Sequence, residues 1–312
     1  MNNKAKITII GAGNVGATSA YTLALSELAP EIILIDKNAD KAHGNAVDIM
    51  HGSKFLAGGA SVIAGDYHDM PGTSIVIITA GANQAPGETR TDLLACNTAI
   101  FKEIISNIKP YITRETILLI VTNPVDILTY ITHTLAGLPK TRVIGSGTTL
   151  DTARLKQIIS SDTGIDPGSI NAYVIGEHGD TAVTIWSRTS IAGMPFEEYC
   201  RFCSSCNSNI KDVVSAQVRN AAYEVIEQKG ATYYAIALAV RRIVECILRD
   251  EKGILTVSSV LEGEYGINDM ALSLPAVIGR NGIERILPID YSEEETDALK
   301  FGAESLKKVI VE

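Results

Sequence analysis

One histidine stands apart from the others in this chain and is placed where it could transfer protons. Of the five histidines, only His178 lies in the second half of the sequence, within Gly176-Glu177-His178-Gly179-Asp180. The glycines on either side would let the ring reach the floor of a cleft. An imidazole has a reference pKa of about 6.5, so it can donate and accept a proton near neutral pH. The alternative interpretation is a plain turn residue.

Two side chains that would complement such a histidine begin an expected helix. Asp151 and Arg154 are three residues apart, so a helix would place them on one face. An aspartate bonded to an imidazole fixes its tautomer and stabilises the imidazolium, and a guanidinium pairs bidentately with a carboxylate. The set suits protonation of a carbonyl oxygen in a substrate that also carries a carboxylate. Asp151 could instead be a simple helix N-cap.

A glycine-rich loop near the start of the chain has the spacing of a dinucleotide site. In Gly11-Ala12-Gly13-Asn14-Val15-Gly16, the first glycine would permit a tight turn, the second an approach to a pyrophosphate, and the third close packing of helix on strand. The helix that follows would offer free N–H groups to the phosphates. Asp36, twenty residues after Gly16, could accept hydrogen bonds from ribose hydroxyls and would repel a 2′-phosphate. The pattern predicts NAD rather than NADP.

Apolar runs and helical patterns alternate through the first 145 residues. The runs are rich in β-branched residues and predict strands buried on both faces, at Lys6–Ile10, Ile32–Ile35, Ser61–Ala64, Ser74–Thr79, Ile117–Val121 and Arg142–Ile144. Helical patterns lie between most of them, at Asn14–Leu28, Lys41–Ser53, Leu93–Ile108 and Val125–Leu135. This order predicts an α/β fold with a doubly wound, Rossmann-type parallel six-stranded sheet.

The alternation ends after about residue 145. Helices are expected at 151–160, 207–228, 232–249 and 293–311, and strands at 171–175, 182–187, 253–260 and 270–278. We therefore expect two domains, an NAD-binding domain over residues 1–145 and an α+β catalytic and substrate domain over residues 146–312.

Composition excludes several classes of protein. Hydrophobic residues make up 46% of the 312 residues, which is typical of a globular chain rather than a disordered one. The net charge of −9 argues against nucleic acid or an anionic membrane as the main partner. No apolar run is long enough for a membrane span, and no signal peptide is visible. With five cysteines, an odd number, reduced thiols and a cytoplasmic location are expected.

Taken in order, these motifs and two others resemble the lactate/malate dehydrogenase family over nearly the whole chain. The additional motifs are Gly87-Glu88-Thr89-Arg90 and Val121-Thr122-Asn123-Pro124. The resemblance implies NAD-dependent interconversion of a small 2-oxo acid and a 2-hydroxy acid. His178 would then be the proton donor and acceptor, Asp151 its orienting partner, and Arg154 the ligand of the substrate carboxylate. Arg90 would polarise the carbonyl from a lid over residues 84–92, although that stretch could be a plain surface loop.

The resemblance also implies further binding residues and an assembly. Asn123 would contact both substrate and cofactor, and Ser146 the nicotinamide amide. The cofactor contacts that it implies are Gly11, Gly13, Asn14, Val15, Gly16, Asp36, Gly81, Ala82, Val121, Asn123 and Ser146. It implies a homotetramer, and no metal ion is expected.

Two positions bear on the choice of substrate. In this family the position that Gln84 matches faces the C3 substituent of the substrate, and it is arginine where that substituent ends in a carboxylate. Closing a lid on oxaloacetate without a cation would bury an unpaired charge, at a cost on the order of 3–5 kcal/mol. Gln84 therefore favours pyruvate over oxaloacetate, which makes malate dehydrogenase the weaker alternative. Thr232 would lie beside the substrate side chain, and the small Ala231 next to it leaves room for a larger pocket. A reductase of branched-chain 2-oxo acids therefore remains an alternative.

Regulation and the cysteines raise separate questions. Many bacterial members of the family bind fructose 1,6-bisphosphate through an arginine and a histidine, where this chain has Lys156 and Asn171. Asparagine supplies no cation, so we expect weak or absent activation by that phosphate. Cys200, Cys203 and Cys206 have a spacing found in iron–sulfur proteins. Because the usual Cys-Pro ligand is missing, three reduced thiols are the favoured interpretation.

Two other classes of function remain as alternatives. A non-catalytic NAD sensor on the same fold would be expected to lack His178, Asp151 or Arg154, and all three are present. An NAD-dependent glycosidase of related fold would need a metal-binding cysteine and histidine pair around its substrate. The setting of His178 matches the dehydrogenase motif instead.

Overall fold

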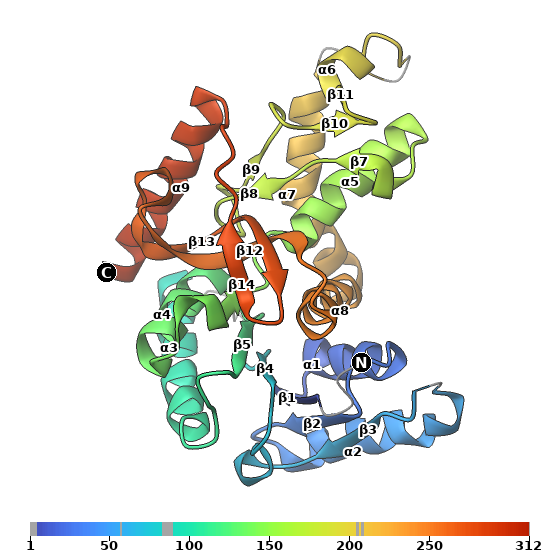
Figure 1. The fold of residues 1–312 in the computed structure, drawn as a ribbon, viewed down its shortest axis with the longest axis vertical. Helices are drawn as coiled ribbons and strands as arrows, with labels where there is room; N and C mark the ends of the chain where they lie inside the picture. The colour runs from blue at the N-terminus through green and yellow to red at the C-terminus, as the bar shows by residue number, and fades with distance from the viewer. Residues whose placement is uncertain (1–4, 57, 83–89, 204–205, 207–208, 312) are drawn as a thin grey trace.

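A computed structural model of the chain describes residues 5–311, except for residue 57 and the segments 83–89, 204–205 and 207–208. Side chains are described throughout this part except at residues 90–91 and 310–311. A large central sheet with helices on both faces organises the molecule (Figure 1). None of the helices described is both long enough and apolar enough to cross a membrane.

Six parallel strands form the core of the first half. They are β1 (Lys6–Ile10), β2 (Glu31–Ile35), β3 (Ser61–Ala64), β4 (Ile75–Ile78), β5 (Ile117–Ile120) and β6 (Val143–Gly145). Their order is β3-β2-β1-β4-β5-β6, so the direction of winding reverses between β1 and β4. The doubly wound sheet predicted from the apolar runs is confirmed, and each strand end lies within one residue of its expected position. Ligands of such sheets bind beyond the carboxyl ends of the strands, near the reversal.

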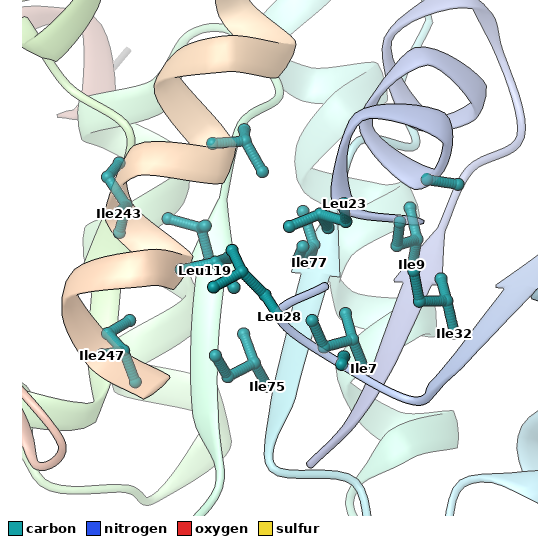
Figure 2. Packing of buried hydrophobic residues seen from close by; sticks show 14 of the residues in the cluster. Ile7, Ile9, Leu23, Leu28, Ile32, Ile75, Ile77, Leu119, Ile243 and Ile247 are labelled. Atoms are coloured by element: carbon teal, nitrogen blue, oxygen red, sulfur yellow. The ribbon is translucent and has the colours of Figure 1, made fainter. Parts of the chain in front are cut away.

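Helices bury both faces of this sheet. The first half contributes α1 (Asn14–Leu25), α2 (Ala39–His51), α3 (Arg90–Ile108) and α4 (Val125–Ala136). Phe101 of α3 and Leu128 of α4 share one buried cluster with β4 and β5. On the opposite face, α1 is joined by α8 (Tyr234–Arg249) from the second half, whose Ile243 and Ile247 point toward Leu119 and its neighbours (Figure 2). The second half therefore helps to cover the first.

Three antiparallel strands extend the parallel sheet. They are β12 (Gly253–Glu262), β13 (Asn268–Gly279) and β14 (Gly282–Ile286), and they complete a nine-stranded sheet of order β14-β13-β12-β6-β5-β4-β1-β2-β3. The extension joins at Ser258 of β12, which pairs with Gly145 of β6. A Cβ at Gly145 would lie 2.7 Å from the Cβ of Ser258, so this close approach needs a glycine. Sequence patterns predicted β12 and β13 but not that they join the first sheet.

The remaining elements form the outer part of the second half. They are α5 (Thr149–Thr163), α6 (Phe196–Tyr199), α7 (Ile210–Lys229), α9 (Glu293–Val311) and the short strands β7 (Ile170–Asn171), β8 (Val174–Ile175), β9 (Val183–Thr184), β10 (Ser190–Ile191) and β11 (Met194–Pro195). The single strand expected over 171–175 is divided, because β7 pairs with β10 whereas β8 pairs with β9. These pairings are long-range, so no local pattern indicated the division.

Candidate active site

The glycine loop connects β1 to α1 and has the geometry of an anion site. Gly11 has a φ of +104°, and a Cβ there would lie 2.5 Å from the backbone nitrogen of Ala80. A Cβ at Gly16 would lie 1.8 Å from the carbonyl oxygen of Gly11. At Gly13, by contrast, a Cβ would meet only the Lys41 amine, at 4.0 Å. The loop is thus tightly packed toward the sheet and open at Gly13, where a pyrophosphate can approach the start of α1.

The start of α1 is electrostatically suited to phosphate. Gly13 is the N-cap and offers no side chain to the N–H groups of Asn14 and Val15, and the first turn contains no acidic residue. Asp36, at the end of β2, accepts a hydrogen bond from the Ala12 amide at 2.6 Å and another from the Asn38 amide at 2.9 Å. Its carboxylate therefore lies against the glycine loop, where it can accept hydrogen bonds from ribose hydroxyls and would repel a 2′-phosphate. These residues fit NAD.

The other expected cofactor contacts follow neighbouring strands at the same edge of the sheet. Gly81 and Ala82 follow β4, Val121 and Asn123 follow β5, and Ser146 follows β6. A buried asparagine links the loops that follow β4 and β5. Asn97 of α3 accepts a hydrogen bond from the Ala82 amide at 2.7 Å and donates one to the Asn123 carbonyl at 2.9 Å. The sequence analysis missed Asn97, because a polar residue inside a helical pattern carries no signal of the loops it will bridge.

A histidine, an aspartate and an arginine meet in the second half. The Nδ1 atom of His178 lies 2.6 Å from Oδ2 of Asp151, and Nη1 of Arg154 donates to Oδ1 of the same carboxylate at 2.9 Å. The Asp151 side chain is only 8% exposed and that of His178 is 24% exposed. One carboxylate thus positions an imidazole and a guanidinium side by side, each still open to a ligand. The alternative roles of a plain turn residue and a simple N-cap do not describe these side chains.

Backbone geometry brings these three residues together from distant parts of the chain. Thr148 is the N-cap of α5, so Asp151 and Arg154 lie in its first turns, on one face. His178 follows β8, and the backbone of Gly176, with a φ of +85°, bonds in both directions to Ser273 of β13. The loop that carries the histidine is therefore attached to the sheet extension.

Burial and charge together set the protonation states of this pair. Burial alone would raise the pKa of Asp151, but the charges and hydrogen bonds of His178 and Arg154 outweigh it and lower that pKa. Burial would likewise lower the pKa of His178, but the Asp151 carboxylate outweighs it and raises that pKa. Both shifts favour an imidazolium against a carboxylate, which is the state that can donate a proton.

Comparison with known proteins identifies the family. The model described as the lactate/malate dehydrogenase NAD binding domain matches residues 5–145, and that of the lactate/malate dehydrogenase alpha/beta C-terminal domain matches residues 148–312. The chain belongs to the lactate/malate dehydrogenase family. It is an NAD-dependent oxidoreductase that acts on a CH–OH group, and its first half holds the cofactor.

Curated and solved members of the family resemble the chain over almost its whole length. An L-lactate dehydrogenase of Acetivibrio thermocellus is 54% identical, with 99% of this chain and 98% of that protein covered. An L-lactate dehydrogenase of Thermoanaerobacter sp. is 55% identical over 98% of both chains. The ligand-bound crystal structure of a minor L-lactate dehydrogenase from Enterococcus mundtii superimposes with a TM-score of 0.95 at 39% identity, covering 99% of this chain and 98% of that one.

For the other residues that the family resemblance implies, the structure gives less. Gln84 lies outside the described residues, and the side chain of Arg90, the first residue of α3, is also not described. Thr232 is half-buried in the connection between α7 and α8. Lys156 is half-buried on α5, where burial lowers its pKa, and Asn171 is exposed on β7.

The cysteine run lies apart from the site, around α6. Cys200, Cys203 and Cys206 are not in disulfides, and Cys206 hydrogen-bonds to the other two. Burial raises the pKa of Cys206, and the neighbouring thiols add to this effect, so the thiol stays protonated. Within the described residues, no three histidine, cysteine or acidic side chains are grouped as metal ligands.

Sequence reasoning also missed a fully buried acid next to the histidine. Asp126, in the first turn of α4, accepts a hydrogen bond from the backbone amide of His178 at 2.7 Å and one from the Ser258 hydroxyl at 2.6 Å. Burial raises the pKa of Asp126 to about 6. The only sequence signal was an acid at a helix start, which also fits a favourable interaction with the helix dipole.

Proposed function

We propose that this enzyme is an L-lactate dehydrogenase that reversibly reduces pyruvate to (S)-lactate with NADH. The observation that carries the proposal is the shared carboxylate of Asp151, which holds the imidazole of His178 beside the guanidinium of Arg154. A 2-oxo acid needs both groups, one for its carbonyl oxygen and one for its carboxylate. The names of the curated relatives, at 50–55% identity, support the same substrate.

The residues divide the reaction between them. Arg154 contacts Asp151 through Nη1, which leaves the rest of its planar fork to pair with the substrate carboxylate. His178 directs Nδ1 at Asp151, so its Nε2 donates the proton to the carbonyl oxygen as negative charge develops there. In the opposite direction the neutral imidazole accepts the hydroxyl proton. When bound, NADH would supply the hydride to the carbonyl carbon, and NAD⁺ would accept it in the opposite direction.

Further roles follow from the family pattern and from position at the sheet edge. The glycine loop, Asp36 and Ser146 hold the cofactor, and Asn123 lies between cofactor and substrate. Arg90 polarises the carbonyl, and Gln84 and Thr232 select the methyl group of pyruvate. The chain divides into an NAD-binding domain over residues 1–145 and a catalytic domain over 146–312. The proposed assembly is a homotetramer in the cytoplasm.

Steady-state kinetics with three substrates test the proposed function. We expect kcat/KM with NADH to be roughly two to three orders of magnitude higher for pyruvate than for oxaloacetate, because Gln84 offers no charge to a second carboxylate. The bulkier 2-oxoisocaproate should also react more slowly than pyruvate. Oxaloacetate or 2-oxoisocaproate turning over as well as pyruvate would contradict the assignment to lactate.

Substitutions of Gln84 isolate the reason for the preference. Gln84→Arg should raise kcat/KM for oxaloacetate and lower it for pyruvate, by roughly 10²-fold in their ratio. Gln84→Glu is the control, because it places the opposite charge at the same position and should reject oxaloacetate more strongly. If both variants left the ratio unchanged, Gln84 would not contact the C3 substituent.

A further inference from the structure

Asp126 is a buried ionisable group that the proposed reaction does not use. It is 2% exposed, and its two carboxylate oxygens are each engaged by a different segment of the chain. Oδ2 accepts the backbone N–H of His178 at 2.7 Å, and Oδ1 accepts the Ser258 hydroxyl at 2.6 Å. The first donor belongs to the loop of the proton donor and the second to β12. Asp126 therefore connects α4, the catalytic loop and the sheet extension at one point.

Hydrogen bonds and nearby charges partly offset the burial of Asp126, which raises its pKa to about 6. Both hydrogen bonds have the short lengths of charge-assisted bonds. The carboxylate also lies in the first turn of α4, where the helix dipole stabilises an anion. These interactions and the positive charge of His178 oppose the effect of burial on its pKa. An ionised Asp126 next to the imidazole is thus compatible with the fold.

Among the described residues, three charged side chains act on the imidazole and a fourth acts on Asp126. Asp151 contacts the ring directly and favours its protonated form, and Arg154, beside Asp151, opposes protonation. Asp126 acts from the side of the backbone and favours protonation. Glu177 precedes His178, its carboxylate accepts a hydrogen bond from the Thr181 hydroxyl, and its charge raises the pKa of Asp126. Asp126 is the second negative charge acting on the ring, after Asp151.

We propose that Asp126 is a positioning residue for proton transfer: it anchors the backbone of His178 to α4 and β12 and supplies a second counter-charge to the imidazolium. This inference rests on the proposed function, in which His178 is the proton donor. Asp126 touches neither substrate nor cofactor in this role. Its two effects differ in their consequences, because the anchor needs only a hydrogen-bond acceptor, whereas the counter-charge needs an ionised carboxylate.

The substitution Asp126→Asn separates the two effects. An asparagine oxygen can still accept the His178 amide, and its NH₂ group can donate to the Ser258 hydroxyl. The anchor is kept and the charge is removed. We expect kcat/KM for pyruvate to begin its alkaline decline about one pH unit lower than in the unmodified enzyme. At acidic pH, where His178 is protonated in both proteins, their rates should differ by less than about threefold.

The control is Glu177→Gln, which removes an adjacent charge that is not bonded to the loop amide. It should shift the alkaline decline by clearly less than Asp126→Asn does. An equal shift in both variants would show a general field effect and overturn the proposal. An Asp126→Asn profile that coincides with the unmodified one, or is lowered evenly at every pH, would also overturn it, since a purely structural role predicts that result.

Nuclear magnetic resonance tests the inference without turnover. The imidazole of ¹³C-labelled His178, assigned by the signal lost in His178→Asn, should titrate at lower pH in Asp126→Asn. In the unmodified protein, the ¹³C-labelled side-chain carboxyl of Asp126 should be ionised at neutral pH, with an inflection near pH 6. This second measurement does not need the variant to fold, and a carboxyl that is still protonated at neutral pH would overturn the proposal. Lack of pyruvate turnover would instead refute the proposed function.

Discussion

At the scale of single residues, the chemistry depends on how one carboxylate is shared. Asp151 has two oxygens and gives one to His178 and one to Arg154. An aspartate bonded only to a histidine would fix a tautomer, but here the same group also holds the guanidinium that binds substrate. A single side chain therefore fixes the position of the proton donor relative to the guanidinium that binds the substrate carboxylate. Its loss should disturb both protonation and orientation.

The pH dependence of the two reaction directions follows from the raised pKa of His178. Pyruvate reduction needs the imidazolium, which is present below that pKa, so its rate should fall as the pH rises through it. Lactate oxidation needs the neutral ring and should rise over the same range. Asp151→Asn removes the charge that raises the pKa, so reduction should decline at lower pH, with kcat reduced about 10²- to 10⁴-fold at neutral pH.

Steady-state rates in both directions, measured between about pH 5 and 10 with a constant ionic strength, check this prediction. The pH–rate profile in each direction should also fit a single ionisation. If Asp151→Asn kept the pH profile of the unmodified enzyme, the carboxylate would not control the imidazole.

At the scale of elements, the cofactor site depends on how closely α1 approaches β1. The approach is set by Gly16, where a Cβ would overlap the carbonyl oxygen of Gly11 at 1.8 Å. Neither partner is a flexible side chain, so the backbone must move to admit a methyl group. The same movement would change the position of the N–H groups at the start of α1. Helix packing and phosphate binding are thus one structural property.

Gly16→Ala should therefore weaken NADH binding and stability together. We expect a loss of roughly 1–3 kcal/mol in the free energy of unfolding and at least about a tenfold rise in the NADH Kd. Fluorescence titration and denaturant unfolding measure the two quantities. Gly44→Ala in α2 is the control, because a Cβ there meets nothing within 4 Å. It should leave the Kd unchanged, and equal effects of both substitutions would contradict this explanation.

At the scale of the whole molecule, the two halves share a sheet and a core. The antiparallel strands of the second half continue the parallel sheet at Ser258, and α8 covers the face beside α1 (Figure 1). On the outside of these two helices, apolar side chains remain exposed at Tyr21 and Leu25 and at Tyr234 and Leu238. Each pair is spaced four residues apart, so each lies along one helix face. Such faces suit contacts between subunits.

The proposed homotetramer can be tested at this surface. Sedimentation equilibrium should give about four times the 33.3 kDa mass of the chain. Leu238, which is 55% exposed, should tolerate Leu238→Ala with little change in assembly. Leu238→Glu would bury a charge in an interface and should shift the protein toward smaller species. A protein that sediments as a monomer, or assembles equally well with glutamate, would contradict the proposed surface.

Local sequence patterns were enough to predict the elements and the chemical identity of much of the site. Isoleucine and valine runs predicted six parallel strands to within one residue at each end, because strands buried on both faces must be apolar throughout. The glycine spacing and Asp36 indicated the cofactor, because those residue types are required by the local backbone geometry of one β-strand and one helix. His178, Asp151 and Arg154 were identified by type and motif before any contact was known.

The contacts between groups from distant parts of the chain became apparent only in the folded molecule. Asp126 is 52 residues from His178 and 132 from Ser258 along the chain, and Asn97 is 26 residues from the carbonyl to which it donates. The pairing of β12 with β6 and the packing of α8 on the first sheet also join segments that are far apart in the sequence. Periodicity reports which face of an element is apolar, but it says nothing of which partner covers that face. Long-range pairing, set by the packing of the whole chain, supplies that information.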